Sequence, residues 1–442
     1  MPWARVRANF GDAPHFLAHG ITTVINLRGS PEQLEWRRRI EAGDLIGPTI
    51  YTSGEFVNEP RVNTPDEVAR EVEAQRSAGY DLIKFHEAWV PGVGFTTTTG
   101  LSPAAYQRLR GSARDAGLPL VGHAPVNLGL TALLEAGQPL AHVGMLANIY
   151  FLPVGASRRW LALTVGAMTV LLVLLVTSRR IPSLRRPLAT QLLAFLAAGG
   201  VALLFMPGGP LFDSLALRLV FTALAAVIVV AAGRLVIAAV TTFRRVPAAR
   251  RERVHAAAAA CAGAALAIAM VLFWLPVAWR SSDSGIDRLA RRIHAAGIPV
   301  QTTLVVYESL AGPPGFRYAD FMKKVTGALH RAGVSLVAGT DANGMPRLAP
   351  GPSLHRELEL LIESGLSVPD ALRAATVAPA QLLGKQHEFG TIAIGHRADL
   401  LLLDANPLED VSRLRNPAGV MARGRWFTRE QLHRMVAALG DN

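Results

Sequence analysis

Four polar residues stand at the ends of short apolar segments that are typical of β-strands. They are Lys84 at the end of LIKF, His123 after PLVG, His142 after PLA, and Asp341 after LVAGT. Imidazole and carboxylate groups both bind zinc and similar divalent ions. Each residue alone has an ordinary structural explanation, such as a buried histidine, a helix N-cap or a solvated lysine. Their joint occurrence at four strand ends predicts a metal site.

The elements that would position these residues alternate in a regular way. Amphipathic segments that end at glycine are followed by short apolar segments, which is the βα pattern of a parallel sheet. The predicted helices are Pro65–Gly79, Ser102–Gly117, Thr131–Gly137, Ile286–Gly297 and Tyr318–Gly333, and the predicted strands are Thr22–Asn26, Thr49–Ser53, Leu82–Phe85, Pro119–Val121, Leu140–Val143, Val300–Leu304 and Ser335–Ala338.

This many βα units favours a (β/α)8 barrel, in which the carboxyl ends of all strands meet on one catalytic face. A doubly wound open sheet is the alternative fold. Such a sheet is expected to carry a glycine-rich phosphate-binding loop after a strand, and no clear loop of this kind is found in the sequence.

Four long apolar segments interrupt the βα pattern. Each is close to the roughly 20 residues that cross a bilayer core, and four in succession predict a transmembrane insert rather than buried soluble helices. The expected spans are Trp160–Thr177, Leu188–Met206, Leu215–Val240 and Val254–Trp279. The predicted organisation is therefore a first barrel part (1–156), the insert (157–282), a second barrel part (283–386) and C-terminal strands with a tail (387–442).

The positive charge of the chain belongs to this insert. The whole chain has a formal net charge of +12, and the stretch from Ser157 to Arg280 has 14 Arg, one Asp and one Glu. The remainder is therefore near neutral, which argues against a nucleic-acid partner and for the lipid bilayer. The single cysteine, Cys261, excludes a disulfide within one chain, and the N-terminus has no apolar segment of a signal peptide.

The arginines also predict an orientation. They gather in the first and third connections between spans, at Arg179, Arg180, Arg185 and Arg186 and at Arg244, Arg245, Arg250, Arg251 and Arg253, whereas the second connection has none. The positive-inside rule places these two connections in the cytoplasm, so both barrel parts lie on the non-cytoplasmic side of a multi-pass protein. Arg218 and Arg234 fall inside the third span, where we expect both to snorkel; a functional intramembrane charge is the alternative.

Several segments carry a family resemblance. They are LAHGITTVINLRGSPE, DLIKFH, GLPLVGHA, LAHVG, GVSLVAGTDA, SLHRELELLIESGLSVPDALRAATVAPAQLLG and GTIAIGHRADLLLLDANPLEDV, which together cover nearly all of the chain outside the insert. With these motifs the chain resembles the metal-dependent amidohydrolase superfamily, in its imidazolonepropionase-like and Xaa-Pro-dipeptidase-like branch.

The resemblance implies a role for each candidate residue. Lys84 would be carboxylated and bridge two metals, His123 and His142 would bind the second metal, and Asp341 would bind the first and transfer a proton. The site would hold one or two divalent ions, expected to be zinc. The enzyme would hydrolyse a C–N bond in a small-molecule or dipeptide-like substrate. Tyr307, Glu308 and His355 would stand where the family places residues of the substrate pocket or residues that support it.

One departure from the family pattern affects this expectation. The family carries a His-x-His pair at the end of the first barrel strand, and nothing here matches it. His15 and His19 are spaced by four on a predicted helix and are not expected to be ligands, while His294 and His330 are expected at the surface. The first barrel strand and the N-terminal strands of the family's small β-sandwich are also unmatched.

The C-terminal strands are therefore expected to be a remnant of that sandwich with an exposed edge. The simplest explanation of these unmatched elements is an N-terminal truncation. A catalytically dead membrane sensor or binding protein is the alternative to a hydrolase.

The place of the insert suggests two roles for it. It begins soon after His142, in a connection on the catalytic face of the predicted barrel. The active site could therefore face the bilayer and take amphipathic substrates. The simpler interpretation, which we favour, is that the spans only anchor the enzyme.

Overall fold

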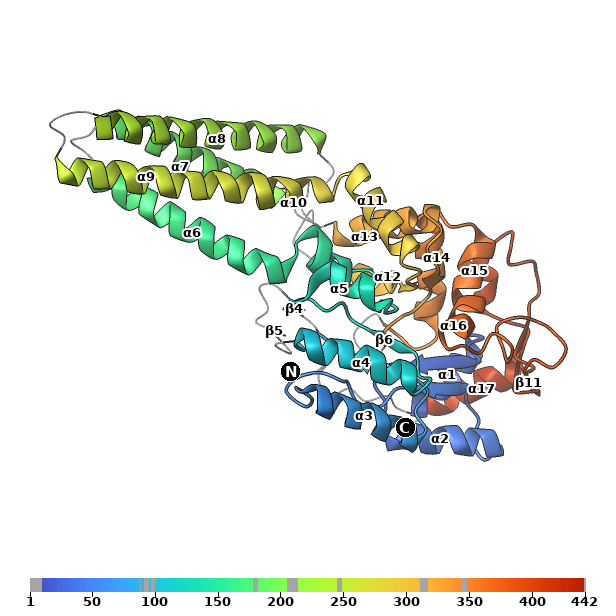
Figure 1. Ribbon diagram of the computed structural model, residues 1–442. Helices are drawn as coiled ribbons and strands as arrows, with labels where there is room; N and C mark the ends of the chain where they lie inside the picture. Colours follow the sequence, from blue (N-terminus) through green and yellow to red (C-terminus); the bar gives the residue numbers. More distant parts are fainter. Residues whose placement is uncertain are drawn as a thin grey trace. The chain divides into compact units, whose positions relative to one another are not determined.

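The computed structural model describes residues 10–87, 89–90, 95–96, 100–177, 182–204, 214–244, 249–310, 317–342 and 348–440. The chain divides into two compact units. The β/α unit comprises Met1–Leu146, Leu289–Ala311 and Ala319–Asn442, and the helical unit comprises Ala147–Arg288 with Gly312–Tyr318 (Figure 1). The insert was predicted over 157–282, within the range of the helical unit.

The β/α unit is built on strands that run parallel in chain order. The paired strands are β1 (Thr23–Asn26) with β2 (Thr49–Thr52), β3 (Ile83–Phe85) with β6 (Leu120–Gly122), and β7 (Val300–Gln301) with β8 (Leu336–Val337). Single parallel bridges between Ser53 and Leu82, and from Leu140 to both Gly122 and Val300, join these pairs. The result is one parallel series, β1-β2-β3-β6-Leu140-β7-β8, which is the order of strands in the wall of a (β/α) barrel.

Helices follow most of these strands, while the first helix precedes β1 and the last follows the C-terminal strands. Their bounds are α1 (Ala13–Ala18), α2 (Pro31–Ala42), α3 (Pro65–Ala78), α4 (Pro103–Asp115), α5 (Gly129–Ala136), α11 (Asp283–Ala295), α12 (Leu304–Ser309), α13 (Tyr318–Arg331), α14 (Pro352–Glu363), α15 (Val368–Ala375), α16 (Val377–Leu382) and α17 (Arg429–Gly440). Two short strands, β4 (Trp89–Val90) and β5 (Phe95–Thr96), pair with each other outside the parallel series.

Local sequence explains the limits of these helices. The side chain of Thr64 accepts from the backbone N–H of Glu67, and the Glu67 carboxylate accepts from the backbone of Thr64, so a capping box begins α3. The helix ends at Gly79, whose φ of +87° lies in the left-handed region that glycine adopts without strain. Its buried Val68 and Val72 belong to the same hydrophobic cluster as Ile83 and Phe85 of β3.

Two of the predicted strands end three residues earlier than expected. The segment predicted as Val300–Leu304 leaves the sheet after Gln301, and α12 begins at Leu304. Of the segment predicted as Leu140–Val143, only Leu140 forms a bridge. The physical reason is the same in both, because Thr303 and His142 have positive φ values that end an extended backbone.

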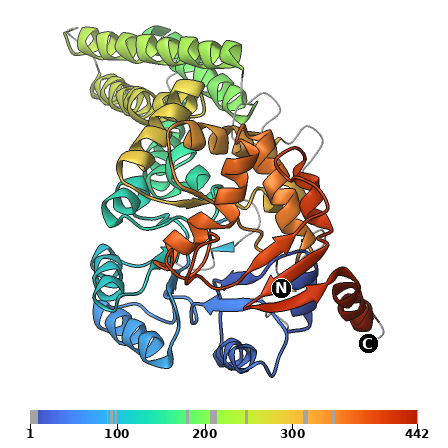
Figure 2. The same cartoon turned by 90° about the vertical axis from the view of Figure 1, so that its right-hand side faces the viewer.

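The C-terminal residues form a separate antiparallel sheet in the order β11-β10-β9, with bounds Arg425–Thr428, Gly419–Ala422 and Leu400–Leu402. Figure 2 shows this sheet beside β1 and β2, and Arg397 donates to the Thr23 hydroxyl at 2.7 Å. Within the described residues β9 has a neighbour on one side only. The preceding GTIAIG segment forms no strand, and its Ile392 and Ile394 are fully exposed.

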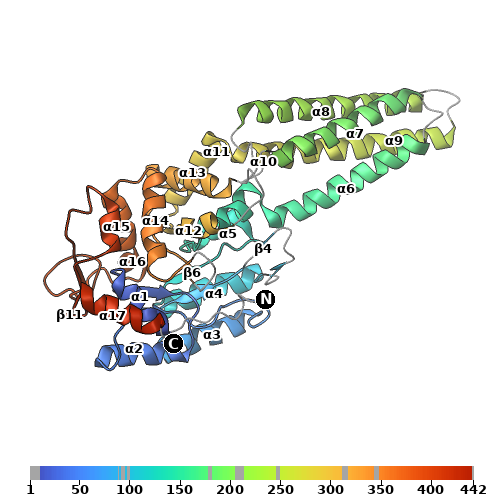
Figure 3. The same cartoon turned by 180° about the vertical axis from the view of Figure 1, so that it is seen from behind.

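The helical unit is a bundle of long apolar helices (Figures 1 and 3). They are α6 (Val154–Thr177), α7 (Pro182–Leu204), α8 (Leu215–Arg244) and α9 (Arg250–Ala269), which continues through a π-helical turn (Met270–Trp274) into α10 (Leu275–Arg280). Proline lacks a backbone N–H, so a π turn just before Pro276 is a common accommodation. The buried Gln191 of α7 donates to the carbonyl of Gly263 in α9 at 2.8 Å.

Three helical stretches of this unit are long and apolar enough to cross a membrane: Ala147–Thr177, Leu215–Arg244 and Arg250–Arg280. They contain the first, third and fourth predicted spans. The second predicted span, Leu188–Met206, extends past the described end of α7 and stays a prediction. The predicted loop positions Arg179, Arg180 and Arg245 lie outside the described residues.

The two arginines predicted inside the third span differ in the structure. Arg218 is buried and donates its Nη2 to the carbonyl and hydroxyl oxygens of Ser281, at 3.1 and 3.2 Å, so it is a packed residue rather than a freely snorkelling one. Arg234 is exposed on the surface of α8.

Candidate active site

Lys84 is buried in the middle of β3. Successive strand residues face opposite sides, so Ile83 and Phe85 contact the outer hydrophobic cluster while Lys84 faces the other way. The side chain is 2% exposed, and this burial lowers the pKa of its ammonium to about 8, an effect that the charge of Asp341 opposes. A lysine with such a pKa has an appreciable neutral fraction near neutral pH, and the neutral amine is the reactive form.

The two predicted histidine ligands lie next to each other. The ring centroids of His123 and His142 are 5.0 Å apart, and the rings are nearly perpendicular. Nδ1 of His123 lies 3.0 Å from the carbonyl oxygen of Glu87, which can only accept, so this nitrogen carries the proton. Nδ1 of His142 lies 3.0 Å from the hydroxyl of Thr303. In His123 this leaves the Nε2 lone pair for a metal ion, whereas the Thr303 hydroxyl can donate or accept and so does not determine the tautomer of His142.

A third histidine, His86, belongs to the same cluster and was not among the residues predicted for the site. Its ring centroid lies 4.1 Å from that of His123 and 4.3 Å from that of Phe56, on which it stacks. Burial, with Lys84 and His142 nearby, lowers the pKa of His86 to about 3, so the imidazole is neutral. The signal in the sequence was the position of His86 directly after β3, at a strand end like those of the predicted residues.

Backbone strain is concentrated at the same place. His142, Thr303 and Asp341 have φ values of +68°, +50° and +46°. Non-glycine residues seldom adopt this region, and a β-branched residue such as Thr303 does so only when its surroundings impose it. All three follow strands or bridges of the parallel series, and strain of this kind is typical of functional sites.

Asp341 comes four residues after β8, and its side chain is exposed to solvent. Desolvation by nearby protein atoms raises the pKa of the Asp341 carboxyl, and the charge of Lys84 opposes this effect. The structure thus places His123 and His142 side by side with the charge of Lys84 near them, and it links Asp341 to this cluster through the charge of Lys84 alone.

The three predicted pocket residues have different surroundings. The hydroxyl of Tyr307 accepts from the backbone N–H of Gly144 at 2.8 Å, which places Tyr307 beside the His142 segment. Glu308 is exposed and accepts two hydrogen bonds from Arg356, at 2.6 and 2.9 Å. His355 is buried on α14 with its ring centroid 5.6 Å from that of His19, and neither of its nitrogens has a hydrogen-bond partner among the described residues. Substrate contacts by these residues stay predictions.

Glu357 of α14 holds the segment around Thr303 in place, and the sequence did not predict it as a residue of the site. Its carboxylate is fully buried and accepts from the hydroxyl of Thr302 and from the backbone N–H of Val305, the latter at 2.8 Å. These two residues flank Thr303, which contacts His142. Burial raises the pKa of Glu357 to about 7. No feature of the sequence SLHRELELL distinguishes this glutamate from its neighbours.

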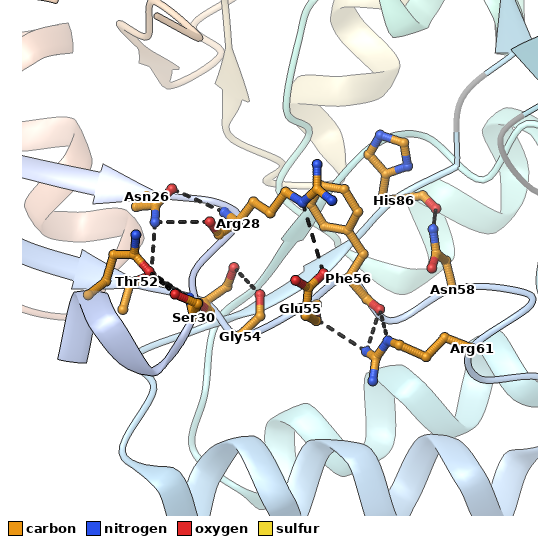
Figure 4. Close-up of polar contacts among 12 residues, drawn as sticks. Asn26, Arg28, Ser30, Thr52, Gly54, Glu55, Phe56, Asn58, Arg61 and His86 are labelled. Carbon is orange, nitrogen blue, oxygen red and sulfur yellow. Dashed lines mark hydrogen bonds and ion pairs between the residues drawn. The ribbon is translucent and has the colours of Figure 1, made fainter. Parts of the chain in front are cut away.

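An aromatic and basic cluster lies at the carboxyl ends of β1, β2 and β3 (Figure 4). The guanidinium carbon of Arg28 lies 5.2 Å from the ring centroid of Phe56, and its Nε lies 3.9 Å from the Glu55 carboxylate. Phe56 stacks on His86, so an unbroken series of contacts runs from Arg28 to His123. An exposed guanidinium in this place can bind an anionic group of a substrate.

The fit of a metal ion to this site depends on Lys84. Within the described part of the chain, no group of three or more His, Cys, Asp or Glu residues has the arrangement of a metal centre. His123 and His142 offer two imidazole nitrogens, and an unmodified ammonium cannot be a ligand. A carboxylated Lys84 would supply an oxygen ligand on the same side of the strands, so the donor set fits a divalent ion when this lysine is modified.

Comparisons with known proteins agree with the geometry. Residues 317–427 match the sequence model of the amidohydrolase family. An ochratoxinase of Aspergillus niger is 35% identical over 101 residues, which are 22% of this chain and 20% of that protein. An imidazolonepropionase of Maricaulis maris is 32% identical over 128 residues, which are 28% of each protein. The aligned stretch thus spans less than a third of either relative.

A solved structure extends the likeness in fold. A prolidase complexed with N-methylphosphonate-L-proline superposes with a TM-score of 0.52 and 16% identity, covering 95% of this chain and 78% of that one. Residues 317–427 therefore resemble the amidohydrolase family in sequence, and the chain shares the barrel fold of the solved prolidase.

Proposed function

We propose that this protein is a membrane-anchored, metal-dependent hydrolase that cleaves a C–N bond in a small-molecule or dipeptide-like substrate. The observation that supports the proposal is the contact of His123 with His142 beside the buried Lys84, where three non-glycine residues, Asp341 among them, have positive φ values. The relatives named as ochratoxinase and imidazolonepropionase, together with the structural likeness to a prolidase, support this reaction class.

Each residue has a definite task in this proposal. Lys84, with its lowered pKa, is the amine that adds carbon dioxide and becomes a carbamate ligand. His123 and His142 would hold a divalent ion, expected to be zinc, through Nε2. When bound, the ion would activate water and polarise the scissile carbonyl. Asp341 accepts the proton of the attacking water and passes it to the leaving amine.

The helical unit would anchor the enzyme. Support comes from the three helices that are long and apolar enough to span a bilayer, and from the arginines at the connections predicted to be cytoplasmic. The β/α unit would then lie on the non-cytoplasmic side. A substrate with amphipathic character is compatible with such an anchor but is not required by it.

A second function, a catalytically inactive membrane sensor or binding protein, is favoured by one observation. The described residues contain no complete metal centre of His, Cys, Asp and Glu side chains. Metal content and hydrolysis distinguish the two functions, because an inactive binding protein needs neither.

The proposal is tested with the Asp341→Asn variant of the full chain in detergent. Hydrolysis of N-acyl amino acids and dipeptides should fall about a hundredfold or more, because the variant lacks the general base. The matched control is Asp320→Asn, since Asp320 is part of a surface ion pair with Lys323. Equal rates for the parent and the Asp341→Asn variant would contradict the proposed mechanism.

A further inference from the structure

A groove of about 730 Å³ lies between α7 and α8 of the helical unit. One part of its wall is apolar and is formed by Ala226, Val227 and Val230 of α8. The other part is polar and is formed by Arg186 and Thr190 of α7 and Arg234 of α8. The groove therefore combines two guanidinium groups and a hydroxyl with an aliphatic surface.

The two arginines have no charge partner in this part of the structure. Both side chains are exposed, and neither forms an ion pair with a described residue. The helices α6, α7 and α8 contain no Asp or Glu, and α9 contains only Glu252 among its described residues. An anion from outside the protein is thus the partner that the groove lacks.

The position of Arg234 makes an anionic partner important. This arginine lies six residues before Val240, the end of the third predicted span, which is about 9 Å along the helix axis. A guanidinium at such a depth in an apolar span is unfavourable unless it is solvated or paired. Arg186 follows the start of α7 by four residues, and both arginines line the same groove, so one anion can engage both.

We propose that this groove binds one acidic glycerophospholipid. Its phosphate contacts Arg186 and Arg234, since guanidinium groups bind phosphate oxygens in pairs of parallel hydrogen bonds. Its acyl chain lies on Ala226, Val227 and Val230. Basic pockets between membrane helices on the cytoplasmic side suit acidic lipid headgroups, and the arginine-rich connections predict that side for this end of α7 and α8. The site is independent of the proposed hydrolase activity.

The test uses the full chain, delipidated in detergent and titrated with dioleoyl phosphatidylglycerol, with the melting temperature and native mass spectrometry as readouts. The parent should bind this lipid in preference to dioleoyl phosphatidylcholine. Arg186→Gln and Arg234→Gln should each raise the half-saturating lipid concentration about fivefold, and the double variant about thirtyfold. The matched control is Arg185→Gln, because Arg185 is exposed on the same helix but does not line the groove.

Further measurements show whether the groove binds an acidic phospholipid, a free anion or neither. Equal binding of the two lipids, or of phosphatidylglycerol by the parent and the double variant, would overturn the site. An equal shift with inorganic phosphate alone would show an anion site without a lipid. Val227→Trp fills the apolar part while keeping both arginines, so it should weaken phosphatidylglycerol binding. Unchanged binding by that variant, with unchanged helical circular dichroism, would also contradict the assignment.

Discussion

The β/α unit and the helical unit differ in the apolar side chains that they expose and in the ionisable side chains that they bury. Most of the large apolar side chains exposed in the described residues lie on α6 to α9, among them Leu172, Leu196 and Ile237. The β/α unit instead buries ionisable groups such as Lys84 and Glu357. A large exposed apolar surface is unfavourable in water and favourable in lipid. An ionisable side chain buried in a β/α fold is typical of a functional site. The comparison teaches that the helical unit has the exposed apolar surface that the proposed membrane anchor requires, whereas the β/α unit has the buried ionisable groups that the proposed active site requires.

The helical unit also differs from one end to the other. Trp160 stacks on Phe273, and the indole N–H groups of Trp274 and Trp279 donate to threonine hydroxyls at 3.1 Å. Trp160 lies near the start of α6, and Trp274 and Trp279 lie near the end of the α9–α10 stretch. The arginine-rich connections join the opposite ends of these helices, from α6 to α7 and from α8 to α9. Aromatic residues favour membrane interfaces, and arginines favour the cytoplasmic one.

The largest effect is expected for the orientation of the helical unit. Alkaline phosphatase fused at Gly209 should be active, and fusions at Ser183 and Pro247 should be silent, because that enzyme works only outside the cytoplasm. An active fusion at Ser183 with a silent one at Gly209 would reverse the predicted orientation.

A smaller effect is expected for the buried carboxylate of the β/α unit. Glu357→Ala leaves the Thr302 hydroxyl and the Val305 N–H without their acceptor, so it should destabilise the fold by about 2–4 kcal/mol. Thermal melting of the full chain in detergent measures the change. Glu359→Ala is the control on the same helix, where partly exposed ion pairs with Arg356 and Arg415 contribute about 1 kcal/mol or less. Equal losses in both variants would show that Glu357 does not support the Thr303 turn.

The buried histidine beside His19 predicts an acid sensitivity of the β/α unit. Burial, together with the charges of His19 and Arg415, lowers the pKa of His355 to about 4, below the ordinary 6.5. Between these values the unfolded chain binds a proton that the folded chain does not, so the free energy of unfolding falls as the pH decreases through this window.

His355→Leu should remove this contribution, which is on the order of 3 kcal/mol at most. Melting temperatures from pH 7 to pH 4 measure it, and the exposed His294→Gln is the control. A parent and a His355→Leu variant with parallel pH profiles would show that another group causes the acid sensitivity.

The sequence predicted the parallel series well because its signals are local. Capping boxes, glycine C-caps and short apolar segments determine where α3 begins and ends and where β3 follows it. The four candidate site residues were found for the same reason, since each stands at or near the end of such a strand. In the structure His123 and His142 lie side by side near Lys84, and the roles of Lys84, His123, His142 and Asp341 stay predictions.

The residues that the sequence did not predict depend on tertiary contacts. Glu357 contacts Thr302 and Val305 across more than fifty positions of the chain, and no local pattern marks such a pair. The burial of Arg218 likewise depends on Ser281 of a later helix. The strand predicted at Val300–Leu304 was too long because the positive φ of Thr303 is imposed by its surroundings rather than by its own preference.

Metal content tests the central claim most directly. The full chain purified in detergent, stripped with a chelator and reloaded with zinc in the presence of bicarbonate should retain one or two equivalents by elemental analysis. Lys84→Ala and His142→Asn should each retain markedly less, while the surface control His294→Gln should match the parent. An unloaded parent, or a Lys84→Ala variant that holds as much zinc as the parent, would contradict a metal-dependent hydrolase and favour the inactive membrane sensor.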